Sequence, residues 1–163
     1  MAIEYEHKYL LKGKPEFVLS GNGLKIKKIY NIEQFYIAND RCRKYTSRAR
    51  CSYTVPTMKF YKECHKIGSG KDTEEIEYNI TDSVYNALKE HCIIGNVISK
   101  CRHVAVDSVG LVWEIDEYTT GQWVAELETP PDKYDVPFDG AIDVTDAFEY
   151  KNISIALNGF PNV

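Results

Sequence analysis

Alternation of charged and apolar residues is the feature that most constrains how this sequence folds. In seven separate segments, acidic or basic residues alternate with mainly apolar residues. In the segment Glu4-Tyr5-Glu6-His7-Lys8, the charged side chains point to one side of an extended chain. A period of two is the signature of β-strands. The pattern predicts strands at residues 3–11, 33–38, 40–46, 56–63, 73–80, 98–106, 111–118 and 122–129.

Turn signals and two helical segments complete the expected fold. Turn residues lie at 21–23, 68–70, 107–110 and 119–121, and the last two turns have hairpin lengths, so their flanking strands are expected to be antiparallel. Thr81 can cap a helix that Gly95 ends, and Thr145 can cap a second, weaker helix. The expected fold class is α+β, with about eight antiparallel strands in a sheet or barrel and a few helices.

Composition narrows the class of protein. The chain has 163 residues, of which 44% are hydrophobic and 27% charged, so we expect one globular domain over residues 1–163. Twenty basic and 24 acidic residues give a net charge of −4, which argues against a general nucleic-acid or anionic-membrane binder. The acidic N-terminal residues do not resemble a signal peptide, and the five cysteines form no Cys-x-x-Cys pair. We therefore expect a cytoplasmic protein with reduced thiols.

The charged face is the informative part of the alternation. Its acids are Glu4, Glu6, Glu75, Glu77, Glu114, Asp116, Glu126 and Glu128, and its bases are Lys8, Arg41, Arg43, Lys59, Lys100 and Arg102. A solvated sheet face is the simple structural explanation. However, like charges at i and i+2 lie roughly 7 Å apart and repel by about 0.6 kcal/mol in water and about 2.4 kcal/mol at a dielectric constant of 20. Repeated like-charged pairs therefore favour a function.

Acids and bases crowded onto one face suit a divalent cation and a polyanion together. Carboxylates hold hard cations such as Mg²⁺ or Mn²⁺, and bases hold phosphate oxygens. Eight acids against six bases leave the face at −2, which would repel a phosphate chain until a cation enters. The sequence thus predicts a metal requirement.

The motifs on this face occur in a characteristic order. They are Glu4-Tyr5-Glu6-His7-Lys8, Gln34-Phe35-Tyr36, Arg41-Cys42-Arg43, Thr57-Met58-Lys59, Glu75-Ile76-Glu77, Lys100-Cys101-Arg102, Trp113-Glu114-Ile115-Asp116 and Glu126-Leu127-Glu128, followed by a tail of Asp143-Val144-Thr145, Tyr150-Lys151-Asn152 and Gly159-Phe160-Pro161. In this order they resemble the CYTH superfamily, the triphosphate tunnel metalloenzymes, over essentially the whole chain.

The resemblance implies a fold, a cofactor and roles for individual residues. It implies an eight-stranded antiparallel β-barrel around a charged tunnel, Mg²⁺ or Mn²⁺ as cofactor, a small-molecule triphosphate as substrate, and a monomer or homodimer. Metal ligands are expected at Glu4, Glu6, Glu114, Asp116, Glu126 and Glu128; phosphate contacts from Lys8, Arg41, Arg43, Lys59, Lys100 and Arg102; and direct catalytic roles for Glu4, Glu6 and Lys8.

Two departures from the family pattern leave the reaction open. Thr73 stands where family hydrolases often have arginine, and Phe148 and Glu149 stand where basic residues often precede the tail motif. The first hypothesis is a metal-dependent hydrolase that removes the terminal phosphate of tripolyphosphate or of a nucleoside or other organic triphosphate. The alternatives are a class IV adenylyl cyclase, which makes cyclic AMP and pyrophosphate, and a protein that binds nucleotide or polyphosphate without turnover.

Overall fold

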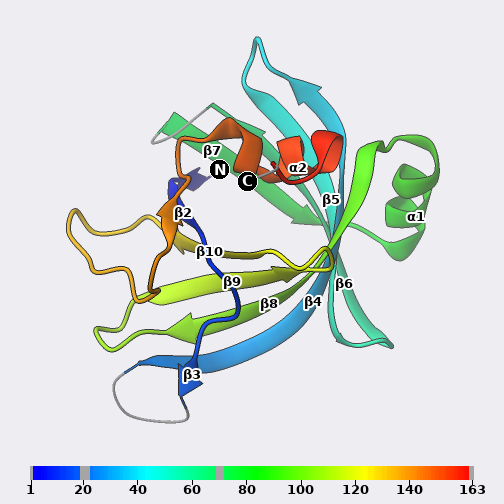
Figure 1. Cartoon of the computed structure of the whole chain (residues 1–163). Coiled ribbons are helices and arrows are strands. Elements are labelled where there is room, and N and C mark those ends of the chain that lie inside the picture. Colours follow the sequence, from blue (N-terminus) through cyan, green and yellow to red (C-terminus); the bar gives the residue numbers. More distant parts are fainter. Residues whose placement is uncertain (1, 19–22, 69–71, 162–163) are drawn as a thin grey trace. The chain divides into compact units, whose positions relative to one another are not determined.

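A computed structural model describes residues 2–18, 23–68 and 72–161, with only the backbone of residues 2–4 and 18 (Figure 1). Within these residues the strands are β1 Ala2–Glu4, β2 Glu6–Leu10, β3 Phe17–Val18, β4 Leu24–Asp40, β5 Tyr45–Val55, β6 Met58–Ile67, β7 Thr73–Asn79, β8 Ile94–Val106, β9 Val112–Tyr118, β10 Trp123–Glu128 and β11 Ile142–Asp143. The helices are α1 Asp82–His91, the 3-10 helix η2 Phe148–Tyr150, and α2 Asn152–Asn158.

The strands are hydrogen-bonded in the order β1-β7-β6-β5-β4-β8-β9-β10-β2-β11, and β3 pairs in parallel with β4. This arrangement confirms the α+β class and the antiparallel sheet. Both predicted hairpins are present, because β8 pairs with β9 and β9 pairs with β10. The strand order has two ends, at β1 and β11, so a closed barrel is not confirmed.

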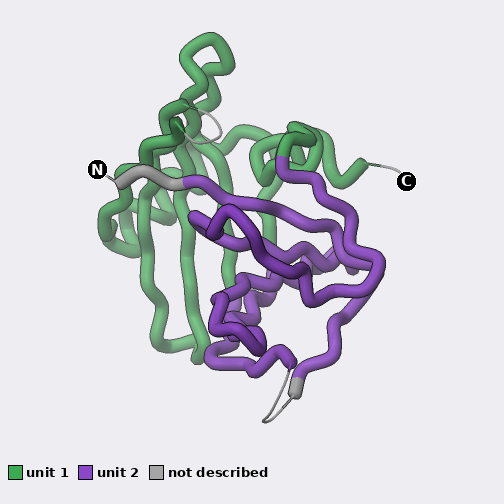
Figure 2. The backbone as a smooth tube through the Cα atoms, turned by 90° about the vertical axis from the view of Figure 1, so that its left-hand side faces the viewer, with its two compact units in different colours: residues 1–4, 32–99, 146–163 green, residues 5–31, 100–145 purple. Residues whose placement is uncertain are grey.

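The chain divides into two compact units (Figure 2). Unit 1 comprises Met1–Glu4, Ile32–Ser99 and Asp146–Val163; unit 2 comprises Tyr5–Asn31 and Lys100–Thr145. Strands β4 and β8 each contribute residues to both units. The single domain over residues 1–163 stays a prediction.

Helix α1 covers one face of the unit 1 strands. Phe35, Ala49 and Cys51 form a buried cluster with Tyr85 of α1. Thr81 caps this helix as predicted, because its hydroxyl accepts a hydrogen bond of 3.2 Å from the backbone N–H of Val84. The side chains that alternate with this cluster, at even-numbered positions of β4 and β5, therefore point away from α1.

Unit 2 has its own apolar core on one face of β2, β9 and β10. The core includes Tyr9, Trp113, Ile115, Ala125 and Leu127, together with Phe138 from the loop before β11. These residues alternate with the charged ones along each strand, so the charged side chains share the opposite face. Within the described residues, no helix is both long and apolar enough to cross a membrane.

Three expectations about the elements are wrong. The strand predicted at 33–38 lies within β4, but the one predicted at 40–46 is instead the end of β4, an exposed turn at residues 41–44, and the start of β5. Thr145 does not cap a helix: α2 begins only at Asn152, and the Thr145 hydroxyl accepts the backbone N–H of Lys8 at 3.0 Å. The break between β1 and β2 at Tyr5 was not predicted either. The turn signals at 21–23 and 68–70 lie mostly outside the described residues.

Candidate functional site

The charged face of unit 2 is a ladder across four neighbouring strands (Figure 1). In the cross-strand register Arg102 lies opposite Asp116, and Glu114 lies opposite Glu126, which in turn lies opposite Lys8. At one end of the ladder, Glu128 lies opposite Glu6. Eight predicted site residues therefore share this face: Glu6, Lys8, Lys100, Arg102, Glu114, Asp116, Glu126 and Glu128.

Asp116 is the centre of a buried ion-pair network. Its carboxylate accepts two hydrogen bonds from Arg102, at 2.7 and 2.8 Å, and lies 2.7 Å from the Nζ atom of Lys100. Arg102 also donates to Glu114 at 2.7 Å. Asp116 has no exposed surface, and burial alone would raise its pKa, but the charges of Arg102 and Lys100 outweigh burial and lower the pKa to about 2. The same network raises the pKa of Arg102 despite its burial.

Lys8 is held by its side chain and by its backbone. Its Nζ atom lies 3.4 Å from Glu126 and 4.0 Å from Glu6. Its backbone N–H donates to the Thr145 hydroxyl at 3.0 Å, and its carbonyl accepts the N–H of Val144 at 2.9 Å. Strand β11 pairs with β2 directly before this contact. The segment around β11 therefore fixes the position of the predicted catalytic lysine.

Carboxylates face one another on this ladder. Glu114 lies opposite Glu126, and Glu128 lies opposite Glu6, an arrangement that destabilises a sheet unless a cation neutralises it. Five acids stand against three bases, so the face carries −2. Carboxylate oxygens are the ligands that Mg²⁺ and Mn²⁺ prefer, so this donor set fits the implied cofactor. The side chain of Glu4 lies outside the described part of the chain.

Unit 1 carries a second charged face, on the side of its strands opposite α1. Arg48 and Arg50 of β5 lie opposite Cys64 and Lys62 of β6, and Lys66 lies opposite Glu75 of β7. Lys62 pairs with Glu77 at 3.1 Å, and Lys66 with Glu75 at 3.9 Å. With Arg48, Arg50, Lys62 and Lys66 against Glu75 and Glu77, this face carries +2 and favours an anion.

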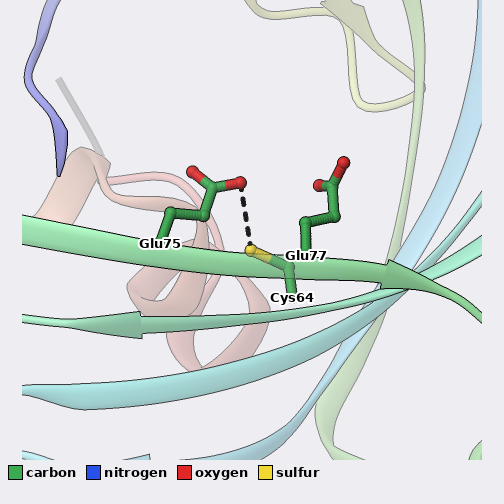
Figure 3. Close-up of side chains that lie close together, drawn as sticks. All are labelled: Cys64, Glu75 and Glu77. Carbon is green, nitrogen blue, oxygen red and sulfur yellow. Dashed lines mark hydrogen bonds between the residues drawn. The ribbon is translucent and has the colours of Figure 1, made fainter. Parts of the chain in front are cut away.

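Cys64 lies between the two glutamates of β7 on this face (Figure 3). Its thiol donates to Glu75 at 3.2 Å, and one ligand atom each from Cys64, Glu75 and Glu77 lie within 4.8 Å of one another. This group could hold a metal ion. However, both carboxylates already pair with lysines, and burial raises the pKa of the thiol, which favours its protonated form. A cation here would have to displace Lys62 and Lys66.

Three of the predicted phosphate-binding residues are not on a charged strand face. Arg41 and Arg43 lie in the exposed turn after β4, where Arg41 stacks on Phe148 at 4.6 Å and Arg43 pairs with Asp40 at 3.7 Å. Lys59 lies on the opposite face of β6 from Lys62 and packs over Tyr53 at 5.5 Å. The expectation that these three bases share the charged face is therefore wrong.

The basic residues that unit 1 places on its charged face were missed by sequence reasoning. Arg48-Ala49-Arg50 has the same spacing as Arg41-Cys42-Arg43 and follows it by seven positions. Lys62 and Lys66 follow Lys59 on the same strand, at even-numbered positions. The signal was present, but alternation alone does not tell which pair lies in a strand.

Comparisons with solved structures identify the fold. The inorganic triphosphatase NE1496 superimposes with a TM-score of 0.63 at 21% identity, over 99% of both chains. The protein PH1819 from Pyrococcus horikoshii OT3 gives 0.55 at 16% identity, over 80% of this chain and 79% of the other. A candidate adenylate cyclase from Vibrio parahaemolyticus gives 0.50 at 18% identity, over 80% and 78%.

These neighbours place the chain in a structural class. No family model matches the sequence, and no curated protein matches it in a sequence search. The chain has the α+β fold of these solved structures, and this fold is consistent with the CYTH superfamily, the triphosphate tunnel metalloenzymes, to which the order of its motifs points.

Proposed function

We propose that this protein is a divalent-metal-dependent hydrolase that removes the terminal phosphate of a triphosphate. The observation that carries the proposal is the run of opposed carboxylates on β9, β10 and β2, interleaved with buried bases. Arg102 and Lys8 neutralise part of this negative charge, but the five acids of the ladder still exceed its three bases by two. A metal–polyphosphate complex supplies the cation for the acids and the anion for the bases.

The cation would be held by Glu6, Glu114, Glu126 and Glu128, while the side chain of Glu4, which was also expected to bind it, lies outside the described residues. A bound Mg²⁺ or Mn²⁺ supplies positive charge that screens the phosphates and activates water for hydrolysis. Asp116 was also expected to bind the metal, but both of its oxygens are engaged by Arg102 and Lys100. We propose that Asp116 instead orients these two bases toward the substrate.

Bases on each of the two charged faces are candidates for contacts with phosphate. Lys8, Lys100 and Arg102 can donate charge-assisted hydrogen bonds to phosphate oxygens and stabilise the charge that develops on the leaving oxygen. In unit 1, we assign the phosphate contacts to Arg48, Arg50, Lys62 and Lys66. Arg41, Arg43 and Lys59 lie away from that face and are the weaker candidates.

Closure of the strands into a tunnel is part of the proposal. β1 pairs with β7, and β2, which begins two residues after β1 ends, pairs with β10. Burial of charged groups supports an enclosed site, since Lys8, Lys100, Arg102 and Glu126 are each at most 5% exposed. Charged side chains are rarely buried to this extent unless they are paired.

The direct test is release of products from tripolyphosphate, ATP and thiamine triphosphate with Mg²⁺ or Mn²⁺. We expect metal-dependent phosphate release that falls at least about 100-fold in Glu126→Gln, as on loss of a group that stabilises the transition state. The matched control is Glu117→Gln, an exposed glutamate on the other face of β9, which should keep full activity. Absence of any product with every substrate and both metals contradicts the proposal.

The adenylyl cyclase alternative is favoured by Thr73, which leaves β7 without the arginine that family hydrolases often have. Chromatography of the ATP reaction separates the two reactions: the hydrolase gives ADP and phosphate, and the cyclase gives cyclic AMP and pyrophosphate. Tight binding without either product set would identify a binding protein instead.

A further inference from the structure

The side-chain NH₂ group of Gln34 has no role that the fold explains. Gln34 lies on β4 and has no exposed surface. Its Oε1 atom accepts a hydrogen bond of 2.9 Å from the Nε atom of Arg50. Its Nε2 atom has no hydrogen-bond partner among the described residues. A buried donor without an acceptor is destabilising, and such groups are rare in folded proteins.

The orientation of the amide is fixed by chemistry. The Nε atom of an arginine can only donate, so the atom of Gln34 that faces Arg50 must be the oxygen. The NH₂ group is therefore the part of the amide without a hydrogen-bond partner among the described residues. It has two hydrogens to donate and needs an oxygen acceptor.

The position of Gln34 indicates what that acceptor is. Its neighbours Glu33 and Phe35 contact Tyr85 of α1, so Gln34 points to the opposite side of the sheet. On that side Arg50 alternates with the core residue Ala49 and stands beside Arg48 and Lys62. This face carries an excess of two positive charges. An anionic oxygen is the acceptor that suits such surroundings.

We propose that Gln34 and Arg50 form a paired anion-binding site in which the Gln34 NH₂ donates to a phosphate oxygen while its carbonyl holds the Arg50 guanidinium in place. The inference rests on the proposed function and adds a neutral residue to its phosphate contacts. Gln34 thus acts in two ways. It positions Arg50, and it contacts the anion directly.

Two substitutions separate these roles. Gln34→Glu keeps an oxygen acceptor for Arg50 but removes the donor and turns a negative charge toward the anion. Gln34→Met removes both the acceptor and the donor. Gln122→Glu, at the other glutamine in the chain, is the matched control. The measurement is the Kd of inorganic tripolyphosphate by calorimetry, with and without Mg²⁺, after circular dichroism has established that each variant is folded.

We expect Gln34→Glu and Gln34→Met each to weaken tripolyphosphate binding at least tenfold, with Gln122→Glu unchanged. Wild-type affinity in Gln34→Glu, with a loss only in Gln34→Met, would mean that Gln34 merely holds Arg50 and would overturn the direct contact. If the wild-type protein binds and hydrolyses tripolyphosphate in that case, the proposed function stands without this inference. If the wild type binds no polyphosphate, both are wrong.

A measurement on the unaltered protein covers the case in which a variant does not fold. The side-chain NH₂ protons of Gln34 should shift in ¹H–¹⁵N spectra when tripolyphosphate is added, and those of Gln122 should not. Saturation with tripolyphosphate without a shift at Gln34 would overturn the proposal.

Discussion

At the scale of single residues, Asp116 shows how a buried charge is kept ionised. It is fully buried, which favours the neutral acid, yet Arg102 and Lys100 both contact its oxygens and keep it negative. Asp116 also stabilises its two partners, because it is a close acidic partner of both buried bases, Arg102 and Lys100. The stability of unit 2 should therefore depend on this one carboxylate.

We predict that Asp116→Asn lowers the free energy of unfolding at neutral pH by about 3–5 kcal/mol, as for removal of one partner from a buried ion pair. The pKa of Asp116 is lowered from 3.8 to about 2 in the folded state. Its contribution is thus fully present above the unfolded pKa and is lost as pH falls through about 4 to about 2. Urea denaturation at several pH values measures this change.

The difference in stability between wild type and Asp116→Asn should shrink over that acidic range. Glu117→Gln serves as the control and should change stability by no more than about 0.5 kcal/mol, as is usual for surface substitutions. A difference between wild type and Asp116→Asn that stays constant down to pH 2 would show that the Asp116 network does not control stability in acid.

At the scale of elements, the connection between β4 and β5 decides which bases face the candidate site. The turn at 41–44 contains no glycine or proline, and Lys44 takes a positive φ of 50° within it. Lysine gives no sequence signal for that conformation. Alternation continues through the turn, so the Arg-x-Arg pair at 41–43 was as plausible a strand segment as the pair at 48–50. Only the hydrogen-bonded register of the structure shows that the pair at 48–50 lies in a strand and the pair at 41–43 in a turn.

This placement predicts unequal effects of two otherwise equivalent substitutions. Arg50→Lys should weaken tripolyphosphate binding at least about tenfold, or about 1.4 kcal/mol. Arginine can donate from Nε to Gln34 while the rest of its planar guanidinium binds phosphate, whereas lysine has a single ammonium group and cannot do both. Arg43→Lys keeps the charge in an exposed turn and should leave the affinity within about twofold. Calorimetry compares the affinities of the two variants. Equal losses of affinity would indicate that the exposed turn at 41–44 contacts phosphate as strongly as Arg50 does.

At the scale of the whole molecule, the sequence predicted the fold class and most of the unit 2 face. The charged ladder residues of β2, β8, β9 and β10 recur at every second position. The strands β8, β9 and β10 are joined by short hairpins, which set their register locally, so the charged ladder could be predicted. The unit 1 face could not, because its register depends on where the long strands β4, β5 and β6 turn. The contact of Thr145 with Lys8 spans 137 positions, and no local pattern encodes it.

The two faces carry opposite excess charge, −2 in unit 2 and +2 in unit 1, and this leads to a prediction for the intact protein. Under the proposed function, Mn²⁺ and tripolyphosphate added together should raise the melting temperature by more than the sum of their separate effects, because ligands that bind the folded state stabilise it. Differential scanning calorimetry measures this coupling. Glu126→Gln should remove most of the synergy, and simple additivity in the wild type would argue against the proposed function.

The pairing of β11 with β2 has a consequence for how the protein is made. β2 is synthesised long before its partners β10 and β11, which are encoded more than a hundred codons later. Until then its backbone amides lack their final partners and can pair with another nascent chain. Chaperones that bind the growing chain would therefore matter most until β10 and β11, at residues 123–143, have been synthesised.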